Sequence, residues 1–187
     1  MDKEQFCNHL ELILNLLKET KSIRKTKPIT ETSSERKQVT NQFMSRYLEL
    51  YLSIKNNLSL KSDEKYQNFI EQSKYFLSHL TSELNRYVVE LEKRTNSIYY
   101  DNEWETIVCP SRSAIEAVKE IYQDTSFEEF YEGENPDALD LNTEDLDDSI
   151  EMKGHKEGYL KEDQIPKGIP TSHWWWWSPE KPPADRE

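Results

Sequence analysis

All four glycines of this chain, at positions 133, 154, 158 and 168, lie in its last third. Glycine is the usual residue where a tight turn needs a left-handed backbone. The first 132 residues must therefore form long elements with few such turns. Apolar residues there recur at intervals of three and four, which is the helical period. The sequence predicts a mainly α-helical protein.

Three helices are predicted within residues 1–95, arranged as an antiparallel three-helix bundle. The first covers 3–24, and the second covers 32–57 and opens with a Thr-x-x-Glu capping box. The third covers 63–95 and would be roughly 50 Å long, against roughly 35 Å for the other two. We expect later parts of the chain to cover its free end.

Residues 96–132 are predicted to pack on this bundle as a connector and short helices. A small β-hairpin is expected within 97–109 and ends at Pro110, and an extended connector is the alternative. Two further capping boxes are expected to start a helix that reaches about residue 123 and then a shorter one. These boxes are formed by Ser113 with Glu116 and by Ser126 with Glu129.

The net charge of −12 comes from one segment, 120–152, which holds 13 acidic residues and no Lys or Arg. We expect residues 133–168 to form an acidic loop with one helical turn near 143–150. Such a segment can bind a basic protein, as a mimic of nucleic acid, or act as a solvated linker. Its pattern lacks the period and central glycine of an EF-hand calcium loop. The candidate partner contacts are Asp137, Asp140, Glu144, Asp145, Asp147 and Asp148.

Four consecutive tryptophans, Trp174, Trp175, Trp176 and Trp177, follow His173 in a proline-rich tail, 169–187. Each indole can bury roughly 150–250 Å², so other atoms must cover these rings. An extended tail would point alternate rings to opposite sides. Either the chain's own helices or a partner's pockets could receive them. A membrane interface is disfavoured, because no basic cluster accompanies the tryptophans.

No catalytic residue, metal ligand or cofactor motif is predicted. Without a glycine before residue 133 there is no phosphate-binding loop of the common kinds, and the histidines lack partners at ligand spacing. His9 and His79 are expected at the surface or its boundary. Two cysteines, no signal sequence and no long apolar run indicate a cytoplasmic protein outside the membrane. A basic patch near residues 18–27 is interpreted as a helix end, and direct nucleic-acid binding is not expected.

Together these features favour a non-enzymatic protein-binding module with an acidic arm and a tryptophan tail. An inhibitor, antitoxin or immunity-type protein of a bacterium or phage has this character, with a basic, nucleic-acid-handling protein as its partner. The alternative is a structural or adaptor subunit whose tail latches onto its own bundle or a neighbouring copy. The sequence does not fix the oligomeric state.

Overall fold

The computed structural model describes residues 3–26, 34–97, 103–130, 133, 135, 137–157, 160 and 162–177. The prediction of a mainly α-helical protein is confirmed, and within these ranges there is no strand. Residues 32 and 33 of the predicted capping box lie outside them, as do residues 98–102 of the predicted hairpin. None of the helices in these ranges combines the length and the apolar character needed to cross a bilayer.

Six α-helices and several short helical turns follow one another along the described chain. The α-helices are α1 (Lys3–Thr26), α2 (Ser34–Asn56), α3 (Glu64–Ser73), α4 (Leu77–Asn96), α6 (Cys109–Tyr122) and α7 (Ala138–Glu157). The short turns are η1 (Leu58–Ser62), η2 (Lys74–Phe76), η3 (Trp104–Val108), η4 (Gln123–Thr125), η5 (Phe127–Phe130), η6 (Glu162–Gln164) and η7 (Trp174–Trp176).

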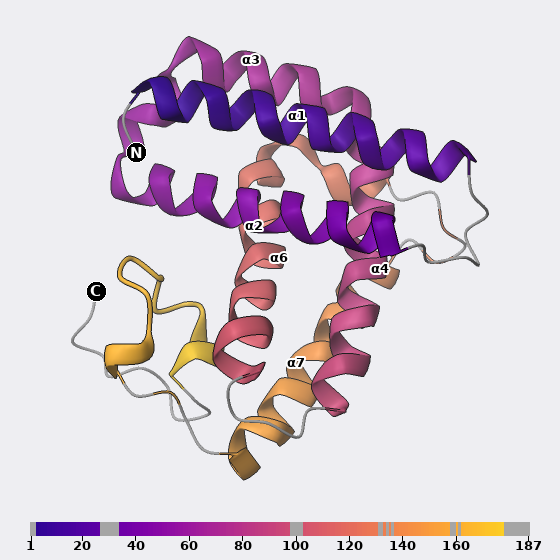
Figure 1. Cartoon of the computed structure of the whole chain (residues 1–187), viewed down its shortest axis with the longest axis vertical. Helices are drawn as coiled ribbons and strands as arrows, with labels where there is room; N and C mark the ends of the chain where they lie inside the picture. Colours follow the sequence, from indigo (N-terminus) through magenta and orange to yellow (C-terminus); the bar gives the residue numbers. More distant parts are fainter. Residues whose placement is uncertain are drawn as a thin grey trace.

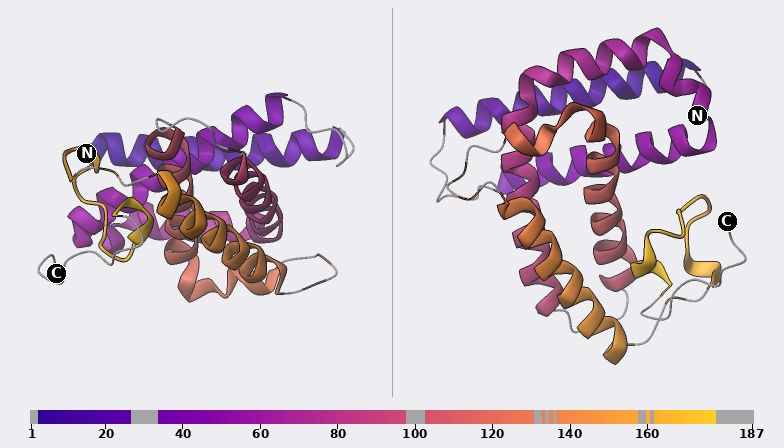
Figure 2. Two further views of the ribbon diagram at one scale, coloured as in Figure 1. Left: turned by 90° about the horizontal axis from the view of Figure 1, so that it is seen from below. Right: turned by 180° about the vertical axis from the view of Figure 1, so that it is seen from behind.

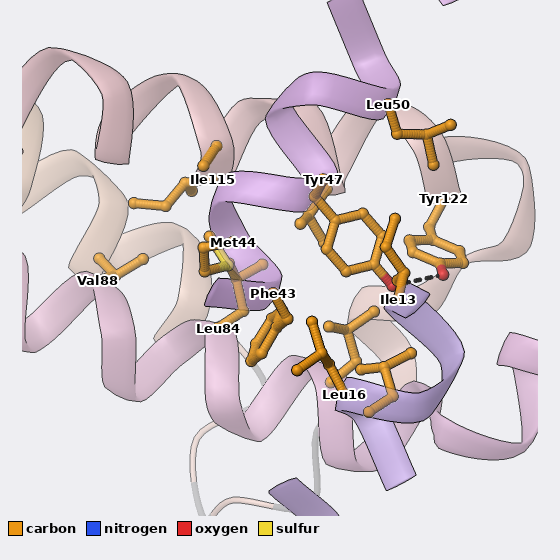
Figure 3. Packing of buried hydrophobic residues seen from close by; sticks show 14 of the residues in the cluster. Ile13, Leu16, Phe43, Met44, Tyr47, Leu50, Leu84, Val88, Ile115 and Tyr122 are labelled. Atoms are coloured by element: carbon orange, nitrogen blue, oxygen red, sulfur yellow. Dashed lines mark hydrogen bonds between the residues drawn. The ribbon is translucent and has the colours of Figure 1, made fainter. Parts of the chain in front are cut away.

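The helices form two groups that cross (Figure 1). Helices α1, α2 and α3 lie side by side, and α1 packs on both of the others. Helices α4, α6 and α7 run away from that group, with α2 packed on α6 and α4 packed on α7 (Figure 2). The core joins both groups, and Figure 3 shows Tyr47 of α2 beside Tyr122 of α6. Residues 1–95 therefore do not form a three-helix bundle by themselves.

The predicted long third helix is two helices. Residues 74–76 form a 3-10 turn between α3 and α4, and Phe76 leaves helical geometry with φ −116° and ψ 1°. The break lets α3 lie along α1, where the Tyr66 and Phe6 rings are 6.5 Å apart, while α4 turns toward α7. A straight helix would have left one of these two apolar stripes in water.

The predicted hairpin region is helical where it is described. Trp104–Val108 forms a π-helical turn that runs directly into α6. Pro110 lies in the first turn of α6, so it is part of a helix and ends no strand. Ser113 is consequently inside the helix and caps nothing. Ser126 has a left-handed φ of 49°, unlike an N-cap residue, and only a 3-10 turn follows it.

The predicted acidic loop contains the 20-residue helix α7. Leu139, Thr143, Leu146 and Ile150 recur every three or four residues and are all buried, on the side that packs against α4. Two side-chain contacts tie the helices further: the Asn142 amide donates to Asn85 Oδ1 at 2.7 Å, and the Asn96 amide donates to Ser149 Oγ at 3.1 Å. The acidic residues thus belong to an amphipathic helix that is docked on the fold.

Candidate functional site

The tryptophan tail packs on Ser113, in the N-terminal half of α6. The Nε1–H groups of Trp175 and Trp176 donate to Ser113 Oγ at 3.0 and 2.7 Å, and His173 Nδ1 lies 3.0 Å from the same oxygen. An indole N–H can only donate, and a hydroxyl has two acceptor sites and one proton. The Ser113 hydroxyl must therefore donate to His173 Nδ1, which fixes His173 as the neutral tautomer that carries its proton on Nε2.

His173 is completely buried between two aromatic rings. It stacks on Tyr51 of α2 with ring centroids 5.7 Å apart and on Trp175 with centroids 4.8 Å apart. Among the described residues its Nε2 has no hydrogen-bond partner. Burial lowers the pKa of His173 to about 4, with Arg112 and Lys55 acting in the same direction and Glu120 opposing them. The ring is a neutral packing element at physiological pH.

Arg112 connects the tail to α7. Its guanidinium lies 4.3 Å from the centre of the Trp175 ring and holds Asp147 of α7 through two hydrogen bonds of 2.6 and 2.9 Å. Its Nη1 also contacts Glu116 at 3.0 Å. Burial would lower the pKa of Arg112, but Asp147 and Glu116 raise it on balance, so the cation is stabilised. One buried charge therefore joins α6, α7 and the tail.

The tail backbone is held as well. The Cys109 thiol donates to the Trp175 carbonyl at 3.2 Å. Gly168 turns the chain toward this site with φ +87°, and a Cβ there would lie 3.3 Å from the Asn56 amide nitrogen. A side chain at position 168 would thus be strained and would crowd the end of α2.

The first three of the four tryptophans form a 3-10 turn that ends at Trp177, whereas an extended segment was expected. Trp175 and Trp176 are 2% and 1% exposed, and Trp174 and Trp177 are half-buried. Residues of α6, α2 and α7 thus cover the side chains of the described tail. Figures 1 and 2 show the tail beside the N-terminal end of α6. Insertion of Trp175 or Trp176 into a partner would require this packing to open.

The predicted acidic contacts divide into two sets. Asp147 is bound to Arg112, and Asp140 lies 2.7 Å from the Lys119 amine. Asp137, Glu144, Asp145 and Asp148 are exposed, and in the described part of the chain none of these carboxylates has an ion-pair partner. The last three share one side of α7 with two exposed apolar residues, Leu141 (49%) and Met152 (58%). We call Leu141, Glu144, Asp145, Asp148 and Met152 the α7 outer face.

The sequence indicated the acidic segment and the tryptophan tail, but not the residues that connect them. Ser113 was noticed as a helix cap, which is a different role, and nothing in the sequence singled out Arg112, Tyr51 or Cys109. Their roles depend on which helices meet. His9 and His79, expected near the surface, are buried: His9 Nε2 lies 2.7 Å from the Arg46 carbonyl and His79 Nε2 lies 2.8 Å from Thr20 Oγ1.

The Ser113–His173 pair superficially resembles a nucleophile and its base. Both residues are completely buried, and both acceptor sites of the hydroxyl are occupied by indole N–H groups. No substrate carbonyl can approach this oxygen, so the pair holds structure. The described residues also contain no group of three or more His, Cys, Asp or Glu side chains placed to hold a metal ion.

Comparisons with protein-family models, with curated proteins and with solved structures find no match to this chain.

Proposed function

We propose that this protein is a non-enzymatic binding module that holds a basic protein on the α7 outer face. The observation that carries the proposal is the composition of this face. Three exposed carboxylates without ion-pair partners in the described chain lie between two exposed apolar side chains on a helix that is otherwise firmly docked. A helix that served only to keep the protein in solution would have no use for Leu141 and Met152.

The two kinds of side chain have separate roles in binding. Glu144, Asp145 and Asp148 attract a basic surface over roughly 8 Å at physiological salt and speed association. Leu141 and Met152 are eleven residues apart, so they lie roughly 16 Å apart along the helix, the span of a short amphipathic helix on the partner. Methionine adapts its shape to such a surface. A nuclease or another nucleic-acid-handling protein has the required positive charge, which keeps an inhibitor, antitoxin or immunity-type role as the proposed class.

In this proposal the tail does not insert into a partner's pockets. With Trp175, Trp176 and His173 buried on Ser113, its role is to latch the C-terminal part of the chain onto α6 and to hold α7 through Arg112. This burial favours the second candidate function, a structural or adaptor subunit whose tail is an internal latch. Both candidates assign the latch the same contacts and differ in whether the α7 outer face binds a partner.

A designed peptide tests the proposal without requiring a known partner. The probe is a fluorescent 14-residue helix with lysines on one face and leucines on the other, and its binding is followed by fluorescence anisotropy. We expect the variant Glu144→Gln/Asp145→Asn/Asp148→Asn to bind about 10-fold more weakly, since each exposed charge contributes up to about 1 kcal/mol. The variant Leu141→Ser/Met152→Ser should weaken binding at high salt as well.

The matched control removes three negative charges from α1, through Glu4→Gln, Glu11→Gln and Glu19→Gln, all exposed residues. It should bind the probe nearly as well as the unmodified protein. Equal weakening by both charge variants would show that only net charge matters, and the α7 outer face would lose its assigned role.

A further inference from the structure

A groove whose lining carries a charge opposite to that of the whole protein lies among α2, α4, η3 and the start of α6. Its volume is about 560 Å³. Sites for small molecules have volumes of roughly 300–1,000 Å³. The groove is thus large enough for a ligand of some ten to twenty non-hydrogen atoms, and it is distant in the sequence from α7 and from the tail.

The floor of the groove is apolar. Leu48 of α2, Leu91 of α4, Ile107 of η3 and Ala114 of α6 line it, and all four belong to the core or pack directly against it. Because these residues come from four elements that are held by the core, the floor is formed by the fold itself. The uncharged polar residues of the lining are Asn41, Ser45, Tyr87, Thr106 and Ser111. Known ligand sites combine an apolar surface with polar groups that orient the ligand.

The rim of the groove is cationic. Lys37 of α2 and Lys93 and Arg94 in the last turn of α4 line it, against a single carboxylate, Glu90. The ion pairs at this rim are long: Lys37 lies 3.8 Å from Glu90, and Arg94 lies 3.6 Å from Glu103. Lys93 is exposed and has no ion-pair partner within the described ranges. Three cations thus line one groove, although the net charge of the protein is −12.

We propose that this groove binds a small anionic amphiphile, a carboxylate with an unbranched apolar chain. The chain would lie on Leu48, Leu91, Ile107 and Ala114, and the carboxylate would lie at the end of α4 beside Lys93 and Arg94. The net negative charge of the protein repels anions. An anion that binds here must therefore be attracted by the cations that line the groove. The inference does not depend on the function proposed for α7.

Decanoate is the probe, added to the full chain well below the concentration at which it forms micelles. Methyl NMR signals of Leu48, Leu91, Ile107 and Ala114 should shift together and saturate below about 1 mM. Calorimetry with the neutral analogue decanol, which has the same chain, should give binding about 10-fold weaker. The variant Lys93→Gln/Arg94→Gln should weaken decanoate about 10-fold and leave decanol unchanged, and Lys37→Gln at the other end should weaken decanoate less.

The control Lys61→Gln/Lys65→Gln removes two exposed cations from η1 and α3 and should leave both affinities unchanged. Ser45→Trp places a large ring in the groove from the exposed side of α2 and should weaken both ligands more than 10-fold. Circular dichroism verifies that each variant is folded. The proposal is overturned if decanoate shifts none of the four methyl groups, if decanol binds as tightly, or if the control weakens decanoate as much as Lys93→Gln/Arg94→Gln.

Discussion

Ser113 has more influence on the tail than its size suggests. A single hydroxyl accepts from two indoles and donates to an imidazole, so all three of its hydrogen-bonding positions are used by residues about 60 positions away. The sequence separation means that this contact forms only when the tail has docked. Each donor would be buried without a partner if the oxygen were removed, and such a loss costs about 1–3 kcal/mol per group.

We therefore predict that Ser113→Ala lowers the free energy of unfolding by about 3 kcal/mol in urea denaturation. The matched control is Ser82→Ala, since the Ser82 hydroxyl bonds to the Ser78 carbonyl of its own helix. It should change stability by less than about 0.5 kcal/mol. If the two substitutions proved equivalent, the Ser113 hydroxyl could not be holding the tail.

His173 predicts a specific dependence of stability on pH. Its pKa falls from 6.5 in the unfolded chain to about 4 in the folded protein because the ring is buried. Below pH 6.5 the unfolded state therefore binds a proton that the folded state does not bind. The free energy of unfolding falls as the pH falls from about 6.5 to about 4. The full loss is about 3 kcal/mol, from a shift of roughly two and a half pKa units.

The variant His173→Asn separates this effect from acid unfolding caused by carboxylates. An Asn side chain can still accept from Ser113 but does not titrate, so the slope between pH 6.5 and 4.5 should disappear from its urea midpoints. Glu83 is buried, but its contacts with Arg36 and Arg86 lower its pKa on balance, so its contribution is lost only at more acidic pH. A slope that persists unchanged in His173→Asn would contradict the assignment.

At the scale of elements, α7 gives the sharpest contrast between a buried and an exposed position. Leu146 is completely buried and Leu141 is 49% exposed on the opposite side. We predict that Leu146→Ala lowers the unfolding free energy by about 3 kcal/mol, as for other buried leucines, and that Leu141→Ala changes it by less than about 0.5 kcal/mol. Thermal denaturation followed by circular dichroism measures both. Two neutral substitutions would mean that the acidic segment is a loop after all.

The helical elements differ in how much of them the sequence could predict. The stripes of α1 and α2 are long and regular, so their helical character and approximate bounds follow from periodicity alone. The break at Lys74–Phe76 has no glycine or proline to mark it, and only the two different packing surfaces of α3 and α4 explain it. Periodicity describes one helix at a time and does not report where its partners lie.

The apolar stripe of α7 is present in the sequence, but the residues in and around it obscure its helical period. One of its four core positions is Thr143, which is polar, and two apolar residues, Leu141 and Met152, lie on the exposed side. Both features weaken the contrast between the faces, and the dense acids then suggest a loop. The capping boxes failed for a similar reason, because Ser-x-x-Glu spacing also occurs inside a helix, as at Ser113 and Glu116.

At the scale of the molecule, charge and aromatic packing are coupled through Arg112. The guanidinium bonds Asp147 of the acidic helix and covers Trp175 of the tail, so the acidic helix and the tail share one buried contact. Glu144, Asp145 and Asp148 lie outside this contact, on the α7 outer face, and three cations of α2 and α4 line a groove elsewhere. The fold thus presents a local acidic face and a local cationic groove at separate places, with Trp175 and Trp176 buried away from both.

Tryptophan fluorescence of Trp104→Phe, which leaves only the four tail indoles, tests most directly whether the chain covers its own tryptophans. A synthetic peptide of residues 169–187 provides the fully exposed reference. The latch predicts that the full chain emits at shorter wavelength than the peptide and is quenched less by iodide, equally over a hundredfold range of protein concentration. An emission maximum and a quenching constant equal to those of the peptide, or protection that appears only at high concentration, would contradict it.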